Sequence, residues 1–112
     1  MEPKLKTRIW VQALIRRAEV SGASAFVARK GEADAGAVVV KVSLLNGTAT
    51  VWASSYGREG ERRWIRGTGD APVPDADAEA YIQRAVARDS DLWVLEVEDR
   101  QGRDFLTEAR DA

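Results

Sequence analysis

The chain contains a dense group of arginines, a residue type suited to binding phosphate groups. It consists of Arg58, Arg62, Arg63 and Arg66. Guanidinium groups bind phosphate through paired hydrogen bonds, so this cluster is a candidate for contact with nucleic acid. The same arginines can instead form ion pairs with the acidic second half of the chain, notably Glu96, Glu98 and Asp99. We favour the ion pairs, because the opposite charges are present in matching number.

Two carboxylates near the end of the chain form a second candidate. Glu96 and Glu98 alternate with Val97, so both project from the same face of a strand. Such a pair is able to bind a divalent cation or to share a proton. Neither a third ligand nor a histidine accompanies the pair, so we interpret it as a solvated strand edge that discourages aggregation.

Gly67-Thr68-Gly69 precedes a predicted helix, as phosphate-binding loops do. It is not followed by the Lys-Ser/Thr pair of a P-loop. The start of that helix also carries Asp75, Asp77 and Glu79, which would repel an anion. The sequence therefore argues against nucleotide binding at this position.

The sequence has no histidine and no cysteine. This excludes the commonest nucleophile–base pairs, the usual zinc sites and all disulfides. An enzyme would have to use carboxylates, Lys41, serines or Tyr56, and none of these has a diagnostic spacing. We therefore expect neither a cofactor nor a metal, and a carboxylate-dependent enzyme is the least favoured of the functions considered.

Length and composition indicate one globular domain over residues 1–112, with residues 1–5 and 108–112 expected to fray. Of the 112 residues, 45% are apolar and 31% are charged, which is ordinary for a folded chain. We expect a cytoplasmic protein, because the sequence shows neither a secretory signal nor a membrane span. Residues 1–68 carry twelve Lys or Arg against six Asp or Glu, whereas the rest carries five against twelve. This asymmetry indicates either a nucleic-acid face or two halves that neutralise each other.

Periodicity predicts the elements that position these side chains. A helix is predicted over about residues 7–20, with Thr7 as its N-cap, and a second helix from about residue 75 to residue 91. Strands are predicted at 24–30, 36–45, 48–56, 61–67 and 92–98. The predicted fold class is α+β, in the order α-β-β-β-β-α-β, with two helices on an antiparallel sheet of about five strands.

Asn46-Gly47 predicts a two-residue hairpin turn between the valine-rich strand and the strand after it. Directly opposed residues then have numbers that sum to 93, which pairs Val42 with Val51 on a core face. The other face pairs Lys41 with Trp52 and is half-polar. Simple hairpins elsewhere place Phe26 and Trp64 on the valine face, and Arg29, Arg63 and Ile65 on the half-polar face.

The half-polar face defines the predicted binding surface. Its candidate residues, together with the arginine cluster, are Arg29, Lys41, Trp52, Arg58, Arg62, Arg63 and Arg66. Cations interleaved with an aromatic ring form a stacking platform for single-stranded nucleic acid. Alternatively, a helix covers Trp52, or Lys41 simply packs on it as a cross-strand pair. Both interpretations stay open.

Three stretches carry a family resemblance: LKTRIWV at residues 5–11, AFVARKG at 25–31 and DAG at 34–36. With Trp64, the second helix and LWV at 92–94, the chain resembles a small bacterial family catalogued as domain of unknown function 1491. The resemblance covers nearly the whole chain and implies a compact bacterial protein. It implies no activity, cofactor or catalytic residue.

We therefore expect a non-catalytic protein-interaction domain whose partner is an unknown protein or a second copy of the chain. Four tryptophans in so short a chain favour it, since tryptophan anchors both cores and interfaces. The contact surface would be the half-polar face or the wide apolar arc of the first helix. The alternative is a module that binds single-stranded nucleic acid, which the acidic pI of about 5.5 disfavours.

Overall fold

The protein is described by a computed structural model of residues 5–111, so the predicted fraying of residues 1–4 and 112 lies outside the described residues. The helices are α1 (Thr7–Val20) and α2 (Asp75–Arg88), close to the predicted ranges. In α1 the residues at helical spacing, among them Trp10 and Leu14, are buried. Lys6, not Thr7, is the N-cap of α1, and the Thr7 hydroxyl instead donates to the Gly36 carbonyl at 2.9 Å.

The strands form one mixed sheet, so the predicted purely antiparallel sheet of five strands is wrong. They are β1 (Ser24–Arg29), β2 (Val38–Ser43), β3 (Thr48–Tyr56), β4 (Arg62–Arg66), β5 (Val73–Pro74), β6 (Trp93–Glu98) and β7 (Ala109–Arg110). Their order is β1-β6-β2-β3-β4-β7, and β5 pairs with β3. The pairs β2–β6 and β4–β7 are parallel, and the other pairs are antiparallel.

The last long strand, β6, lies inside the sheet, between the edge strand β1 and β2. It is apolar on both faces: Trp93 and Leu95 belong to one core cluster, and Val94 to the other. A strand of this kind is stable only where both faces are covered. The expected hairpin between β1 and β2 therefore does not form, and Glu96 and Glu98 do not lie on a strand edge as predicted.

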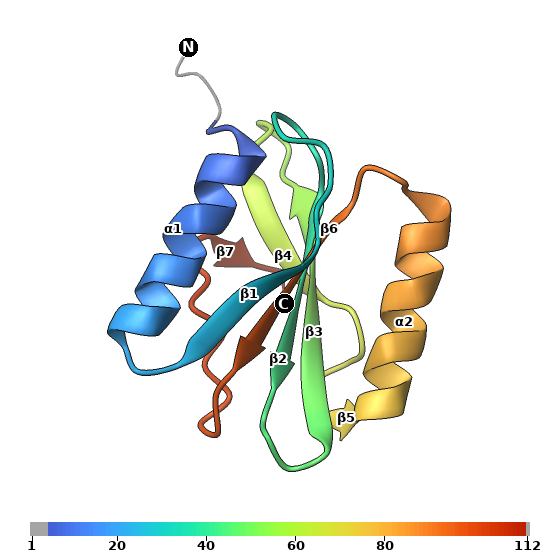
Figure 1. The fold of residues 1–112 in the computed structure, drawn as a ribbon. Helices are drawn as coiled ribbons and strands as arrows, with labels where there is room; N and C mark the ends of the chain where they lie inside the picture. Colours follow the sequence, from blue (N-terminus) through green and yellow to red (C-terminus); the bar gives the residue numbers. More distant parts are fainter. Residues whose placement is uncertain (1–4, 112) are drawn as a thin grey trace.

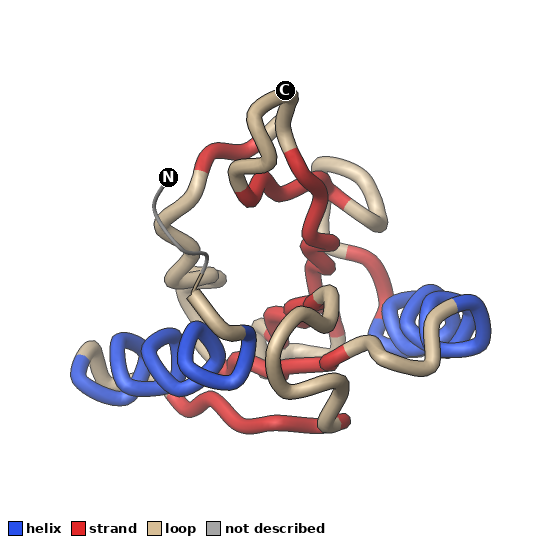
Figure 2. The backbone as a smooth tube through the Cα atoms, turned by 90° about the horizontal axis from the view of Figure 1, so that it is seen from above, coloured by secondary structure: helices blue, strands red, loops and turns tan. Residues whose placement is uncertain are grey.

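The sheet is the middle of three layers, with α1 on one face and α2 on the other (Figure 1). The core under α1 contains Trp10, Trp52 and Trp64, whereas the smaller core under α2 contains Val51 and Ile82. Seen from above, the sheet follows a curved path between the helices (Figure 2). Both faces of its centre are thus covered.

The β2–β3 hairpin is shifted by one residue from the predicted register. Opposed residues have numbers that sum to 92, so that Val40 faces Trp52 and Lys41 faces Val51. The reason is a three-residue loop, in which Leu45 takes a φ of 61° in addition to the positive φ of Gly47. Because a one-residue slip exchanges the two faces of a strand, Lys41 and Trp52 lie on opposite sides of the sheet.

The other predicted face assignments have mixed outcomes. Trp64 lies with the valines of β2 under α1, as predicted. Phe26 does not, because β1 pairs with β6, and the register sets Phe26 opposite Glu96 on the Lys41 side. After β6 the chain turns at Gly102 and returns along the α1 side, where Leu106 enters the core and β7 joins β4. Among residues 5–111, no helix is long and apolar enough to cross a bilayer.

Candidate functional site

The residues of the predicted binding surface are divided between the two sides of the sheet. Lys41 and Arg29 lie on the α2 side and line one cleft. Trp52 lies on the α1 side, where the residue is 7% exposed. The predicted lysine–tryptophan face is therefore wrong, because its two central residues do not share a surface.

Lys41 is a buried cation held by three carboxylates from two elements. Its Nζ lies 2.7 Å from Asp75 and 2.6 Å from Glu79, both on α2, and 3.7 Å from Glu96 on β6. Burial by itself would lower the pKa of Lys41, but these carboxylates outweigh it and raise the pKa above its usual value. Burial raises the pKa of Glu96, although the charge of Lys41 acts against that rise. This cluster attaches α2 to the sheet.

The cleft beside Lys41 has a volume of about 300 Å³ and opens between α2 and the end of β1. At its rim, Arg29 donates from Nη1 to the carbonyl oxygens of Ser90 and Leu92 at 3.1 and 2.7 Å. Arg29 and Lys41 thus share a cleft, but Arg29 is bound to the loop that follows α2. The cleft is lined by side chains of both signs of charge and by aliphatic side chains such as Ile82.

Trp52 is covered by arginines rather than by Lys41. The guanidinium carbon of Arg66 lies 5.0 Å from its ring centroid, and that of Arg110 lies at 5.3 Å. Both distances fit cation–π contacts. A base therefore cannot stack on Trp52 unless these guanidinium groups move, which removes the aromatic half of the predicted platform.

The arginine cluster lies on β4 and the loop before it. Its ion pairs are not the predicted ones with Glu96, Glu98 and Asp99: Arg63 pairs with Asp111, and Arg66 with Asp70 at 3.7 Å. Asp99 instead binds Arg103 at 2.9 Å, and this bond lowers the pKa of Asp99. Arg58 lies exposed in the loop between β3 and β4, and Arg62 stacks over Trp10 at 5.1 Å.

Glu108 makes a contact between distant parts of the chain that the sequence reasoning missed. Its carboxylate accepts hydrogen bonds from the indole Nε1 of Trp10 at 2.8 Å and of Trp64 at 3.0 Å. Burial alone would raise the pKa of Glu108, but the two indole bonds outweigh this and lower it. In sequence, Glu108 lies 98 positions from Trp10 and 44 positions from Trp64. No local pattern identifies such a contact in advance.

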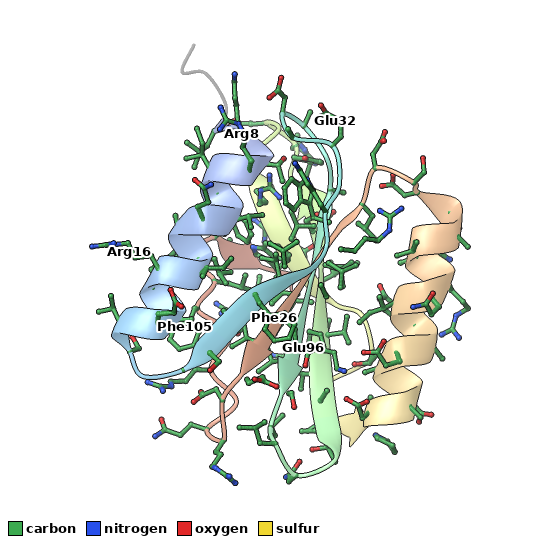
Figure 3. The ribbon with its side chains drawn as sticks, in the orientation of Figure 1. Arg8, Arg16, Phe26, Glu32, Glu96 and Phe105 are labelled. Atoms are coloured by element: carbon green, nitrogen blue, oxygen red, sulfur yellow. The ribbon has the colours of Figure 1, made fainter. Side chains whose placement is uncertain are left out.

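The free edge of β1 is the other feature that the sequence reasoning missed. Within residues 5–111, β1 pairs only with β6, so its outer backbone groups have no strand partner. Phe26 is 45% exposed and Val27 is 39% exposed on this edge. Figure 3 shows Phe26 on β1 with Glu96 next to it. The signal for this edge is the apolar character of β6 on both faces, which places β6 inside the sheet and leaves β1 outside.

The described residues contain no group of three or more His, Cys, Asp or Glu that could hold a metal ion. The apolar arc of α1, the other surface considered from the sequence, packs against the sheet through Trp10, Val11 and Leu14. It is therefore core and not an open surface. The β1 edge and a cleft beside the first turn of α1 are, by contrast, open to a partner.

Comparison with known proteins gives consistent results. The family model described as "Protein of unknown function (DUF1491)" matches residues 5–107. The crystal structure of a DUF1491 family protein from Caulobacter crescentus CB15 at 1.87 Å resolution is 50% identical, with a TM-score of 0.85, covering 96% of this chain and 100% of that one. An NMR structure of a DUF1491 family protein from the same organism is 48% identical, with a TM-score of 0.85 and coverages of 99% and 100%.

A more distant relative has the same fold. The solution structure of protein Atu0922 from A. tumefaciens is 30% identical, with a TM-score of 0.81, and covers 98% of each chain. No curated protein matches the chain. None of the matching descriptions names a ligand, a partner or a reaction.

Proposed function

The chain belongs to the DUF1491 family, and we propose that it is a protein-interaction domain that binds a second copy of itself along the free edge of β1. The family membership confirms the resemblance found in the sequence and leaves the activity open. The observation that carries the proposal is an unpaired edge strand bearing two exposed apolar side chains.

Unpaired edge strands are templates for another strand, and proteins that avoid such pairing blunt them with prolines or inward-pointing charges. β1 has the sequence SAFVAR and contains no proline. Its regular part, residues 24–27, keeps an unbroken register with β6, and a bulge lies between Val27 and Arg29. The bulge limits further pairing to about the first four residues of β1, where Phe26 and Val27 lie.

Charge supports a second copy as the occupant and an antiparallel orientation. The beginning of β1 lies against Glu98 and Glu96 of β6, whereas its end carries Arg29 and Lys30. In an antiparallel pair about a twofold axis, the basic end of β1 in one copy lies beside the acidic end in the other copy. A parallel pair would instead place the two basic ends, and the two acidic ends, next to each other.

The twofold axis also defines a register. Even-numbered residues of β1 face the α2 side, so only registers with an even residue sum keep matching faces together. A sum of 52 sets Phe26 opposite Phe26 of the other copy, and Ala25 opposite Val27. Cross-strand aromatic pairs contribute about 0.2–1 kcal/mol beyond an alanine pair.

Sedimentation equilibrium over a wide concentration range tests the proposal. The wild-type chain is expected to form a dimer, and Phe26→Glu to be monomeric, because the new carboxylates oppose each other beside Glu96. Ile65→Glu is the matched control, since Ile65 is 39% exposed on β4 and should keep the dimer. A wild-type chain that stays monomeric at millimolar concentration contradicts self-pairing. The same holds if the monomeric chain binds a basic extended peptide instead of a second copy.

Binding of single-stranded nucleic acid is a second candidate, favoured by the arginines at the β4–β7 side. This arginine row is Arg58, Arg62, Arg63, Arg66 and Arg110. With Trp52 covered, its main contacts would be with phosphates, and affinity would fall steeply as salt rises. Unchanged mobility of a single-stranded oligonucleotide at low salt would exclude this function.

A further inference from the structure

We propose that the cleft beside the first turn of α1 binds a zwitterionic α-amino acid with an apolar side chain. The cleft has a volume of about 340 Å³. Residues that matter for recognition are Leu5, Trp10, Asp34, Tyr56, Glu61 and Arg62. This inference is independent of the β1 edge, because the cleft shares none of these residues with it.

Arg62 supplies the group that would meet the ligand carboxylate. Its guanidinium carbon lies 5.1 Å from the ring centroid of Trp10, which fixes the plane of the group. Among residues 5–111, its buried Nη1 atom has no hydrogen-bond partner. A buried donor without an acceptor is unfavourable, and a carboxylate is the acceptor that matches the guanidinium geometry.

The same wall of the cleft already holds one carboxylate. Glu108, which also lines the cleft, is bound by the indole nitrogen atoms of Trp10 and Trp64. These two donors stabilise the ionised form of Glu108, as the lowered pKa of its carboxyl group indicates. Because their hydrogen atoms are used by Glu108, the remaining donor for a ligand carboxylate is Arg62.

Two other carboxylates decide the class of ligand. Asp34 and Glu61 line the cleft. Within residues 5–111, the Asp34 side chain makes only a long ion pair, with Lys6 at 3.9 Å, and both side chains are largely exposed. With Glu108 the two carboxylates outnumber Arg62, so a simple anion would be repelled. A ligand that also carries an ammonium group satisfies both signs of charge, and the α-amino acid is the smallest common molecule that does so.

The rest of the lining selects the side chain of the ligand. Trp10, Tyr56 and Leu5 present aromatic and aliphatic surface, and Leu5 is 54% exposed at the mouth of the cleft. The volume lies in the usual range of small-molecule sites, about 300–1,000 Å³, and is large enough for an aromatic amino acid. Phenylalanine is therefore the first probe.

The test is an NMR titration that follows the indole Nε1–H resonance of Trp10. Phenylalanine is compared with 3-phenylpropionate, which lacks the ammonium group, and with phenethylamine, which lacks the carboxylate. Phenylalanine is expected to bind at least about tenfold more tightly than either analogue, which corresponds to about 1.4 kcal/mol. Equal binding of either analogue, or an unmoved resonance at about 10 mM phenylalanine, overturns the proposal.

Variants separate the two halves of the site. Arg62→Met keeps an apolar stem on Trp10 and is expected to abolish binding of phenylalanine. The double variant Asp34→Asn with Glu61→Gln, both in exposed loops, is expected to do the same. Arg58→Met is the control, because Arg58 lies exposed in the neighbouring loop and outside the cleft lining. Spectra without ligand report whether each variant is folded. Retained binding in both folded test variants contradicts the assignment.

Discussion

Replacing Glu108 by glutamine tests whether the C-terminal segment is attached through the two indole bonds. Glutamine has nearly the same shape as glutamate but only one acceptor oxygen, and its amide nitrogen is a donor. One indole N–H of the pair Trp10 and Trp64 would keep an acceptor, although an uncharged one. The other would face the amide nitrogen or lose its partner.

The expected cost follows from these contacts. Hydrogen bonds to a charged group contribute about 1.5–3 kcal/mol each, and neutral ones about 0.5–1.5 kcal/mol. Glu108 loses one charged bond and exchanges the other for a neutral bond. Because the side chain is only partly buried, solvent screening places the total near the lower end, at about 2 kcal/mol.

Urea unfolding measures this cost directly. With a slope of about 1–3 kcal/mol per molar urea, the midpoint should fall by roughly 1 M, while the slope itself stays constant. Glu19→Gln is the matched control, because Glu19 is exposed on α1 and the change of charge is the same. Faster hydrogen exchange at the Nε1 atoms of Trp10 and Trp64 should accompany the loss of stability.

The reasoning is refuted if Glu108→Gln and Glu19→Gln lower the free energy of unfolding equally, by less than about 0.5 kcal/mol, which is the usual effect of a surface substitution. Unchanged exchange at both indole groups would lead to the same conclusion. In that case the tail would be attached by Leu106 and the β4–β7 pairing, not by Glu108.

Three other predictions follow from the same structure. The pKa of Glu108 is lowered on folding, so its contribution to stability is present above the ordinary glutamate pKa and is lost as pH falls through the folded value. Between pH 6 and pH 3, the free energy of unfolding should therefore fall less in Glu108→Gln than in the wild type. Lys41→Met should cost about 3 kcal/mol by urea unfolding, because it leaves three carboxylates facing each other, two of them half-exposed. Gly31→Ala should cost about 1–3 kcal/mol in thermal unfolding, because a Cβ there would lie 2.2 Å from the backbone oxygen of Asp91.

Local patterns predicted the elements, since helices and strands follow from periodicity within a few residues. The helix over Thr7–Val20 and the strand that begins at Thr48 appear where the pattern sets them. Trp64 was likewise predicted among the valines of the core. These inferences depend on neighbours in sequence, and they were correct for that reason.

The order of the strands depends on contacts between distant parts of the chain. Trp93, Val94 and Leu95 are apolar in succession, which is typical of a central strand, and this pattern contained the missing information. The hairpin register could not be read from Asn46-Gly47 alone, because Leu45 adopts a positive φ and lengthens the loop by one residue.

The candidate site was the least predictable part. The observed register of β3 differs by one residue from the predicted one, so Trp52 and Lys41 lie on opposite sides of the sheet and do not form the predicted joint surface. Glu108 lies 98 residues from Trp10, and its role depends on the path of the C-terminal tail. A sequence indicates which side chains are able to form such contacts, but the tertiary path decides which ones meet.

The central position of β6 has a consequence for synthesis on the ribosome. The N-terminal part of the chain emerges first, yet β1 has no strand to pair with until residues 93–98 leave the exit tunnel. The segment from β2 to β5 can assemble early, because its contacts are local. The nascent chain therefore presents the valines of β2 to chaperones until residues 93–98 have emerged.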